Sequence, residues 1–314
     1  MARILITQQL VDGGLDALEG SGHEVTYRQE ASPMARAELL AAIGSFEAII
    51  CTLADTIDDE VLAAGVRLSV VANVAVGYDN IDLGAALRRG ITVCNTPGVL
   101  DGSTAELTML LMLAARRRSS DREADLRQGR WLGWGIAGNL GLDLSGATLG
   151  LVGYGRIAQA VARRAAAFDM SVLHHTRRPT GEPGWCASLL EMAAATDVLS
   201  VHVPLSPVTT GLIDRSVLAA LRPTAVVINT ARGPVVDEAA LAEALEEGRL
   251  WGAGLDVYVG EPTISARLLA APHTVLLPHI GSATAGTRLA MCRLAVNGVL
   301  EVLSGRRPAN IVEA

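Results

Sequence analysis

Short apolar runs alternate with amphipathic segments along almost the whole chain. The runs suit strands that are buried on both faces, and the segments between them have the polarity pattern of helices. A strand–helix–strand order brings consecutive strands into one parallel sheet with helices over both faces. Half of the 314 residues are hydrophobic but only 3% are aromatic, so the core would consist of small aliphatic side chains. The alternation therefore predicts an α/β protein built on mostly parallel sheets that helices cover on both faces.

The expected elements form two series, separated by an irregular segment rich in glycine and tryptophan at 129–146. Strands of the first series are expected at 3–7, 24–28, 47–53, 67–77 and 91–96, with helices at 14–20 and 35–44. This series ends in a long helix from Ser103 to Arg118, in which Ser103 and Glu106 would form a capping box. Strands of the second series are expected at 147–152, 170–176, 198–203, 225–230, 252–258 and 274–280. Its helices are expected at 156–168, 188–195, 214–221, 237–248 and 287–306.

Two domains follow from this order of elements. One is discontinuous and consists of residues 1–98 and 288–314, because the last helix is expected to return to the first sheet. The other spans residues 99–287 and carries the glycine-rich turn described below. A single continuous sheet is the alternative, and the length of the chain argues against it.

Charge, cysteine content and apolar runs exclude several classes of protein. The formal net charge of −7 argues against a nucleic-acid partner, because phosphate backbones require basic surfaces. The N-terminus does not resemble a signal peptide, and the most apolar helical stretch, 107–115, is too short to span a bilayer. We therefore expect a soluble cytoplasmic protein with no membrane partner. The cysteines form no CxxC pair, so we expect reduced thiols and no metal site at Cys51, Cys94, Cys186 and Cys292.

The segment GYGRIA at 153–158 matches the dinucleotide-binding pattern G-x-G-x-x-[GA]. An apolar run precedes it and an amphipathic helix follows, as the motif requires. The first glycine would permit a tight turn, the second would let a pyrophosphate approach the backbone, and the alanine would let the helix pack on the strand. The phosphates would bind to free N–H groups at the helix N-terminus. An ordinary glycine-rich turn is the alternative. The residues expected to contact the cofactor here are Gly153, Tyr154, Gly155, Arg156 and Ile157.

The strand after this helix ends without the acidic residue that usually binds the adenosine ribose. The expected position holds Thr176, Arg177 and Arg178 instead. A carboxylate there would repel a 2′-phosphate, whereas arginines can pair with it through charge-assisted hydrogen bonds. We therefore expect NADP(H) to be preferred, with NAD(H) as a possible second cofactor. A purely solvated loop is the alternative.

Arg232, Glu261 and His279 lie at the C-terminal ends of three successive expected strands. Because the carboxyl ends of parallel strands share one edge of a sheet, these residues would gather where ligands bind. Arginine can clamp a carboxylate and polarise a carbonyl group. Histidine can donate a proton, and a neighbouring carboxylate favours the charged imidazole. The set suits the reduction of a 2-oxo acid, although each residue taken singly could be structural.

Longer segments carry a resemblance to a known family. The segments NTARGPVVDEAAL, GLDVYVGEP, PHIGSAT, LGLVGYGRIAQAVARR and VANVAVGYDNIDL resemble those of the D-isomer-specific 2-hydroxyacid dehydrogenases. The similarity runs in the family's order from about Glu47 to Asn310. It implies an oxidoreductase with two Rossmann-like domains, a cleft between them and usually a homodimer.

The resemblance also implies roles for individual residues. Arg232, Glu261 and His279 match the catalytic triad, and Arg232 and His279 would also contact the substrate. The segment NVAVGYDNID is similar to the family's substrate loop, in which the N–H groups of Val76 and Gly77 would bind the substrate carboxylate. Other positions that match the lining of the cofactor site are Thr104, His202, Val203, Pro204, Thr209, Thr230, Ala231, Asp256 and Gly281.

Within the family, residues 70–83 and 90–100 are most similar to the glyoxylate and hydroxypyruvate reductases, and HHTRRP resembles their NADP-type loops. Phosphite dehydrogenases carry a lysine where this chain has Ala75, which argues against a dianionic inorganic substrate. The segment 261–272 does not distinguish glyoxylate, hydroxypyruvate and bulkier 2-oxo acids.

Two other functions and two roles of the tryptophan-bearing segment stay open. The functions are a dinucleotide-sensing binding protein of the corepressor type, and a dehydrogenase for formate or phosphite. The segment 129–141 and the helix before it are expected to contribute to a homodimer interface. The alternative role for Trp131 and Trp134 is to cover the substrate cleft.

Overall fold

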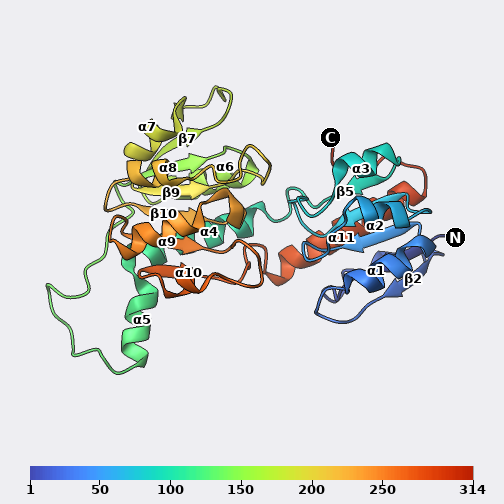
Figure 1. The fold of residues 1–314 in the computed structure, drawn as a ribbon, viewed down its shortest axis with the longest axis horizontal. Coiled ribbons are helices and arrows are strands. Elements are labelled where there is room, and N and C mark those ends of the chain that lie inside the picture. The colour runs from blue at the N-terminus through green and yellow to red at the C-terminus, as the bar shows by residue number, and fades with distance from the viewer. Residues whose placement is uncertain (314) are drawn as a thin grey trace. The chain divides into compact units, whose positions relative to one another are not determined.

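The computed structural model describes residues 1–313, and its chain divides into two compact units (Figure 1). Unit 1 consists of Met1–Leu100 and Ser282–Ala314, and unit 2 of Asp101–Gly281. The chain thus leaves unit 1, builds the whole of unit 2 and then returns. The two junctions follow Leu100 and Gly281, whereas the boundaries expected from the sequence follow residues 98 and 287.

Unit 1 is built on a five-stranded sheet in the order β2-β1-β3-β4-β5. Every pairing in it is parallel, and Ile50 of β3, for example, lies opposite Ala72 of β4. This strand order is a doubly wound one, in which the chain runs outward in both directions from β1 and β3. The strands are β1 (Arg3–Ile6), β2 (Glu24–Tyr27), β3 (Ala48–Cys51), β4 (Val70–Asn73) and β5 (Thr92–Cys94).

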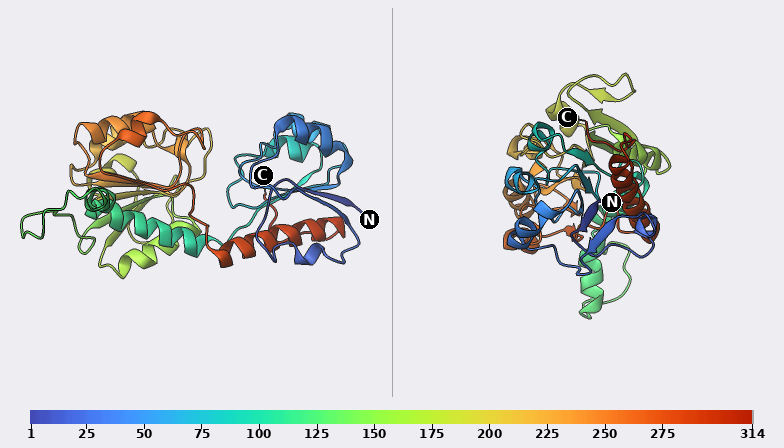
Figure 2. Two further views of the ribbon diagram at one scale, coloured as in Figure 1. Left: turned by 90° about the horizontal axis from the view of Figure 1, so that it is seen from below. Right: turned by 90° about the vertical axis from the view of Figure 1, so that its right-hand side faces the viewer.

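Helices cover both faces of this sheet. Three short helices lie over one face and the long C-terminal helix α11 lies along the other (Figure 2). Asp58 and Asp82 cap α2 and α3, because their carboxylates accept the N–H groups of Val61 at 3.1 Å and Ala85 at 2.8 Å. The helices are α1 (Arg36–Ala42), α2 (Asp59–Ala64), α3 (Leu83–Arg88) and α11 (Ala285–Leu303), with short 3₁₀ turns η1 (Asp16–Leu18) and η2 (Ile43–Ser45).

Unit 2 is built on a seven-stranded sheet in the order β12-β11-β10-β9-β6-β7-β8. All of its pairings are parallel as well. The strand order reverses between β6 and β9, which is the point in such sheets where ligands bind. The strands are β6 (Thr148–Val152), β7 (Ser171–His175), β8 (Trp185–Cys186), β9 (Val198–Val201), β10 (Val226–Asn229), β11 (Gly252–Leu255) and β12 (Thr274–Leu276).

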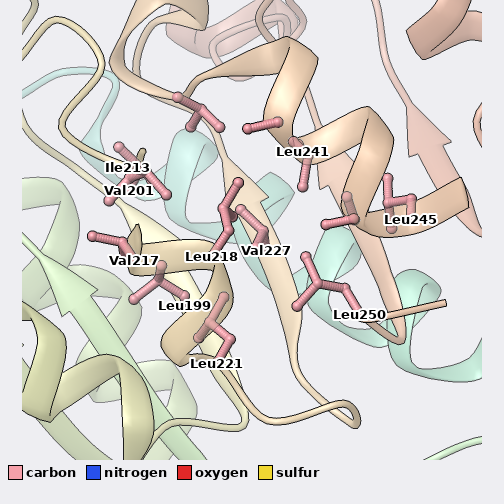
Figure 3. Packing of buried hydrophobic residues seen from close by; sticks show 14 of the residues in the cluster. Leu199, Val201, Ile213, Val217, Leu218, Leu221, Val227, Leu241, Leu245 and Leu250 are labelled. Carbon is pink, nitrogen blue, oxygen red and sulfur yellow. The ribbon is translucent and has the colours of Figure 1, made fainter. Parts of the chain in front are cut away.

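Two hydrophobic clusters lie on opposite faces of the unit 2 sheet. Val226 and Ile228 of β10 face the helices α4 and α6, whereas Val227 between them faces α8 and α9. Figure 3 shows the second cluster, in which Leu218 of α8 and Leu241 of α9 pack on the strands. The helices are α4 (Asp101–Arg117), α6 (Arg156–Ala166), α7 (Leu189–Ala194), α8 (Arg215–Ala220), α9 (Glu238–Glu246) and α10 (Ala266–Ala270), with the 3₁₀ turn η3 (Gly233–Val235).

A helix and loop, residues 119–141, extend from the rest of unit 2 (Figure 1) and are called the arm below. The arm begins with α5 (Ser119–Arg127), which a left-handed residue, Arg118 at φ 51°, separates from α4. The Arg118 guanidinium lies 3.7 Å from the ring centroid of Trp251, which fixes this corner. The loop exposes large apolar side chains, at 57–99% of their surface: Trp131, Leu132, Trp134, Ile136 and Leu140.

Most expected elements are present, and the differences have local causes. The capping box at Ser103 is wrong, because α4 begins at Asp101 and Glu106 instead pairs with Arg164 of α6 at 3.2 Å. The helix expected at 14–20 is only the turn η1, in which Leu18 is the one buried residue. The short elements α2, α3, α5, β8 and α10 were not expected.

The described residues also bear on the other classes considered. None of the helices within residues 1–313 is both long enough and apolar enough to cross a membrane. No group of three or more His, Cys, Asp or Glu side chains in the same residues could hold a metal ion. Cys51, Cys94 and Cys292 are buried free thiols, and Cys186 is a half-buried one.

Candidate functional site

Arg232, Glu261 and His279 follow three adjacent strands at the carboxyl edge of the unit 2 sheet. Arg232 comes after β10, Glu261 after β11 and His279 after β12, and these strands are neighbours in the sheet. The structure therefore brings together the three residues that the sequence suggested as a set.

His279 and Glu261 form a direct hydrogen bond, with 2.7 Å between Nδ1 and Oε2 and one third of each side chain exposed. The other carboxylate oxygen, Oε1, accepts the N–H group of Tyr258 at 2.8 Å. Burial alone would raise the pKa of Glu261, but these two hydrogen bonds and the charges of His279 and Arg232 outweigh it and lower the pKa. Glu261 is therefore a carboxylate that holds Nδ1–H, and it leaves Nε2 as the atom that can exchange a proton with a ligand.

Asp256, at the end of β11, fixes the turn after His279. Its side chain is 1% exposed, and its two oxygens accept the N–H groups of Ile280 and Gly281, both at 2.8 Å. Burial raises the pKa of Asp256, and the two N–H groups partly offset this. These bonds hold His279 in the left-handed backbone conformation, φ 54°, which a histidine rarely adopts.

Tyr258 connects the same two loops from the other side. Its hydroxyl donates to the carbonyl groups of Leu277 at 2.8 Å and Leu255 at 3.1 Å, while its N–H group binds Glu261. Tyr258 thus holds the segment after β12 close to the loop that carries Glu261. Both partners of the His279–Glu261 hydrogen bond are positioned by residues of β11 and its loop.

The loop of Arg232 is tied down by Asn229, the last residue of β10. The Asn229 side chain accepts the N–H group of Ala231 at 3.0 Å and donates to the carbonyl of Arg232 at 2.9 Å. The next residue must be glycine, because a Cβ at Gly233 would lie 2.0 Å from the carbonyl carbon of Tyr258. The backbones after β10 and β11 therefore touch, which keeps Arg232 near enough to Glu261 for its charge to lower the pKa of that carboxyl group.

The glycine turn at 153–158 lies at the switch point between β6 and β9. Gly153 has φ 92°, and a Cβ on it would lie 2.8 Å from the carbonyl oxygen of His202 and 2.9 Å from Cγ1 of Val203. Gly155 has no atom within 4 Å of the place where its Cβ would be. Gly155 also has no side chain to cap α6, so the first N–H groups of this helix, which begins at Arg156, remain for an external acceptor. The turn therefore offers open space next to N–H groups that have no acceptor among residues 1–313.

The loop after β7 carries Thr176, Arg177 and Arg178. Both arginines are exposed, and neither guanidinium has a hydrogen bond or ion pair with another residue among 1–313. The Thr176 hydroxyl donates to the Arg178 carbonyl at 2.7 Å and lies 3.2 Å from Nε1 of Trp185, which donates to it. Thr176 thus shapes the loop that presents the two arginines.

Tyr154 belongs to the glycine turn, and its side chain contacts the strand that leads into the arginine loop. Its ring stacks on that of His174, with 3.9 Å between the centroids. His174 is buried, its Nε2 lies 2.7 Å from the Thr180 hydroxyl, and burial lowers its pKa. The glycine turn and the arginine loop are therefore connected through one pair of stacked rings.

The remaining expected cofactor positions divide into two groups. Thr104, Thr230, Asp256 and Gly281 lie close together: Thr108 bonds to both threonines, and a Cβ at Gly281 would be 3.5 Å from Thr104. The Thr209 hydroxyl, by contrast, is engaged within its own loop, by the carbonyl of Pro204 at 2.6 Å. Burial lowers the pKa of His202 to about 4, so this side chain is neutral at physiological pH.

Two of the four expected substrate residues belong to unit 1. Val76 and Gly77 follow β4 and are half-buried at the carboxyl edge of that sheet. Sequence reasoning did not single out Asn229, Tyr258 or Thr108. The only signal for Asn229 and Tyr258 is a position at or just after the end of a strand, and Thr108 lies within the helix α4.

Comparisons with known proteins show which family the chain belongs to. Residues 109–281 match the D-isomer specific 2-hydroxyacid dehydrogenase, NAD binding domain. The chain is 39% identical over 319 residues to a glyoxylate reductase of Thermococcus litoralis, with 99% of this chain and 96% of the relative covered. A glyoxylate reductase of Pyrococcus furiosus is 40% identical, with 99% and 95% covered.

Solved structures show the same fold over the full length. A protein from Thermus thermophilus has a TM-score of 0.93 and 46% identity, with 99% of this chain and 100% of that chain covered. An NADPH-dependent glyoxylate/hydroxypyruvate reductase from Sinorhizobium meliloti, solved with NADP and malonate, has a TM-score of 0.88 and 37% identity, with 99% and 96% covered. On this evidence the chain belongs to the D-isomer-specific 2-hydroxyacid dehydrogenase family.

Proposed function

We propose that the protein is an NADPH-dependent reductase of small 2-oxo acids, with glyoxylate and hydroxypyruvate as the first substrates to test. The observation that carries this proposal is the 2.7 Å hydrogen bond between His279 and Glu261 at the sheet edge that also holds Arg232. The names of the Thermococcus, Pyrococcus and Sinorhizobium relatives support the same substrate class.

The residues of unit 2 fit a nicotinamide dinucleotide. The open space at Gly155 and the uncapped start of α6 suit a pyrophosphate. Arg177 and Arg178 are exposed cations without partners among the described residues, in the position that suits a 2′-phosphate. The low pKa of His202 keeps a further positive charge out of the site. We therefore propose that unit 2 binds the dinucleotide and that it binds NADP(H) in preference to NAD(H).

The triad can carry out the protein's share of the reduction. A nicotinamide cofactor, when bound, would supply the hydride for this reduction. Arg232 would bind the substrate carboxylate and the carbonyl oxygen with its planar fork. The His279 imidazolium would donate its Nε2 proton to that oxygen, which completes the 2-hydroxy acid and leaves a neutral imidazole held by Glu261. Unit 1 is proposed as the substrate-binding domain, with the N–H groups of Val76 and Gly77 on the same carboxylate.

We also propose a homodimer in which the arm covers apolar surface of a second copy. The arm exposes two tryptophans and four aliphatic side chains, which is more apolar surface than an isolated loop usually carries. An aspartate of α5, Asp121, anchors the arm to His273 at 2.7 Å, so its direction is fixed at the base.

The first prediction concerns the cofactor and the substrate. Initial rates are measured with NADPH and NADH against glyoxylate, hydroxypyruvate, pyruvate, phenylpyruvate and phosphite. We expect steady turnover of a 2-oxo acid and a higher kcat/KM with NADPH. Replacing Arg177 and Arg178 by alanine should reduce kcat/KM with NADPH by about 10–150-fold per lost charged hydrogen bond and change NADH little. Arg163→Ala, an exposed arginine toward the far end of α6, is the control.

Equal losses with both cofactors would contradict the assignment of these arginines to the 2′-phosphate. Tight cofactor binding without turnover of any 2-oxo acid would favour the dinucleotide-sensing alternative. Turnover of phosphite alone would favour the inorganic-substrate alternative.

The second prediction separates the two glycines of the turn. Gly155→Ala should leave the melting temperature near that of wild type, because the site has room, but should raise the Kd for NADPH at least about tenfold. Gly153→Ala should instead lower the melting temperature, because its positive φ costs about 1–2 kcal/mol and its Cβ meets the loop after β9. Thermal unfolding and a cofactor titration measure both effects. A Gly155→Ala protein that binds NADPH normally would show that no pyrophosphate lies against this residue.

The third prediction concerns the triad. His279→Ala should lower kcat by about 10²–10⁴-fold and leave cofactor binding nearly intact. Glu261→Gln should move the alkaline limit of reduction to lower pH, because it removes the negative charge that favours the imidazolium. Arg232→Lys should also lower kcat/KM strongly, since an ammonium group lacks the planar fork.

His273→Ala is a matched control for His279→Ala, because His273 also has a positive φ, 60°, and also binds a carboxylate at 2.7 Å. The pH dependence of kcat/KM is compared for all four variants. Wild-type turnover in His279→Ala, or an alkaline limit displaced upward in Glu261→Gln, would mean that the proton donor is another group.

The fourth prediction concerns assembly. Light scattering at micromolar concentration should give twice the mass of one chain. Trp131→Ser together with Trp134→Ser should shift the protein toward the monomer, because these are the largest exposed side chains of the arm. Leu87→Ser, which removes an apolar side chain 67% exposed on unit 1, should not. A wild-type monomer would refute the proposal, and a dimeric double variant with impaired substrate binding would favour a role of the tryptophans over the substrate.

A further inference from the structure

Two asparagines at the carboxyl edge of the unit 1 sheet have no place in the mechanism above. Asn73 ends β4 and is completely buried, and Asn95 follows β5 and is 8% exposed. A buried amide is costly unless its hydrogen bonds are made. Both side chains direct their NH₂ groups at backbone carbonyls of the loop between Val74 and Tyr78.

The first two carbonyls of this loop are held from the end of β5. The Thr96 N–H group donates to the carbonyl of Ala75, and Nδ2 of Asn95 donates to the carbonyl of Val76, both at 2.8 Å. In a trans peptide the N–H group points away from the carbonyl of the same peptide plane. The N–H groups of Val76 and Gly77 therefore both point away from the end of β5.

The third carbonyl is held from β4. Nδ2 of Asn73 donates to the carbonyl of Gly77 at 2.8 Å and also to Oδ1 of Asn80 at 3.0 Å. The same plane argument turns the N–H group of Tyr78 away from Asn73. Asn80 in turn donates to the carbonyls of Thr52 and Asp55, so the loop is tied to the segment after β3 as well.

This pattern differs from that of an extended strand, in which successive N–H groups point to opposite sides. Here neighbouring N–H groups are turned the same way, which is the arrangement of backbone concavities that bind anions. The N–H groups of Val76, Gly77 and Tyr78 donate to no acceptor in the described residues 1–313. Each of the three carbonyls is therefore occupied while the N–H groups remain for a ligand.

The C-terminal segment fixes Asn95 in turn. Asn310 is 4% exposed, its side chain donates to the Asn95 carbonyl at 2.7 Å, and its own carbonyl accepts the Asn95 N–H group at 3.1 Å. Asn310 fits only because α11 has glycine at 298, where a Cβ would lie 2.8 Å from the Asn310 side chain. The hydrogen bonds thus run from α11 through Asn310 and Asn95 to Val76.

We propose that Asn73 and Asn95 are positioning residues for the substrate carboxylate, and that the N–H group of Tyr78 is a third donor beside those of Val76 and Gly77. The asparagine amides bind the loop carbonyls and do not touch the substrate. The identity of the anion as the carboxylate of a 2-oxo acid rests on the proposed function. The orientation of the three N–H groups rests only on the hydrogen bonds of unit 1.

The experiment measures how tightly oxalate binds to the full-length protein saturated with NADPH. Oxalate is a two-carbon dicarboxylate that resembles glyoxylate but has no carbonyl group that the enzyme could reduce. Calorimetry gives the Kd for wild type, Asn73→Ala and Asn95→Ala, two variants that release the loop from different strands. Kinetics give the KM for glyoxylate, the KM for NADPH and kcat, and thermal unfolding gives the melting temperature. Ser69→Ala is the matched control, because it removes one side chain-to-carbonyl hydrogen bond, to Glu47 at 2.9 Å, at the opposite end of β4.

We expect each asparagine variant to raise the Kd for oxalate and the KM for glyoxylate by about 10–150-fold, the worth of a hydrogen bond to a charged group. The kcat at saturation and the KM for NADPH should stay within about threefold of wild type, since a tenfold change already needs 1.4 kcal/mol. Ser69→Ala should behave as wild type.

Three outcomes would overturn the inference. The first is that the wild-type protein binds no oxalate, and the second is that the asparagine variants have a Kd for oxalate within a factor of two of the wild-type value. The third is that the variants lose affinity for oxalate and for NADPH to the same extent. A wild type that binds oxalate, loses this binding in both variants and yet reduces no 2-oxo acid would support the inference and contradict the proposed function.

Discussion

The buried carboxylate of Asp256 is the interaction on which the geometry of the triad depends. A carboxylate out of contact with water is stable only when hydrogen bonds replace its hydration. Here the replacement comes from two consecutive N–H groups of the turn after β12, each at 2.8 Å. To supply them, the chain must turn sharply directly after His279, which explains the left-handed φ of that residue. The position of His279, proposed above as the proton donor, is therefore set by the side chain of Asp256.

Both sheets use buried asparagines to satisfy backbone groups at the carboxyl edge, and unit 2 also uses glycines. In unit 2, Asn229 binds the Ala231 N–H group and the Arg232 carbonyl, while Gly153 and Gly233 let neighbouring loops come into direct backbone contact. Unit 1 keeps polar side chains, and Asn73 and Asn95 satisfy carbonyls that would otherwise be buried without partners. In both units an asparagine side chain therefore holds the carbonyl of a loop residue for which substrate binding is proposed above.

Features that depend on neighbouring residues could be predicted from the sequence. Every strand longer than two residues in the structure was expected, because each is a short apolar run between polar segments. The triad was also accessible, since each member follows such a run. The helix α5 was missed because none of its residues is buried, so no apolar pattern marks it. The role of Asn95 was missed because its partner Asn310 is 215 residues away, and no local pattern records such a pair.

The discontinuity of unit 1 has a consequence for the order in which the chain is completed during translation. Residues 1–100 leave the ribosome first, but β3, β4 and β5 remain without the helix that covers one of their faces until α11 has been made. Unit 2 is continuous, so all of its strands are available before unit 1 receives its last element. Because domains generally fold as units once their chain is complete, the segment synthesised first is the one that waits longest. During that interval the apolar face of its sheet is the surface that a chaperone would have to shield.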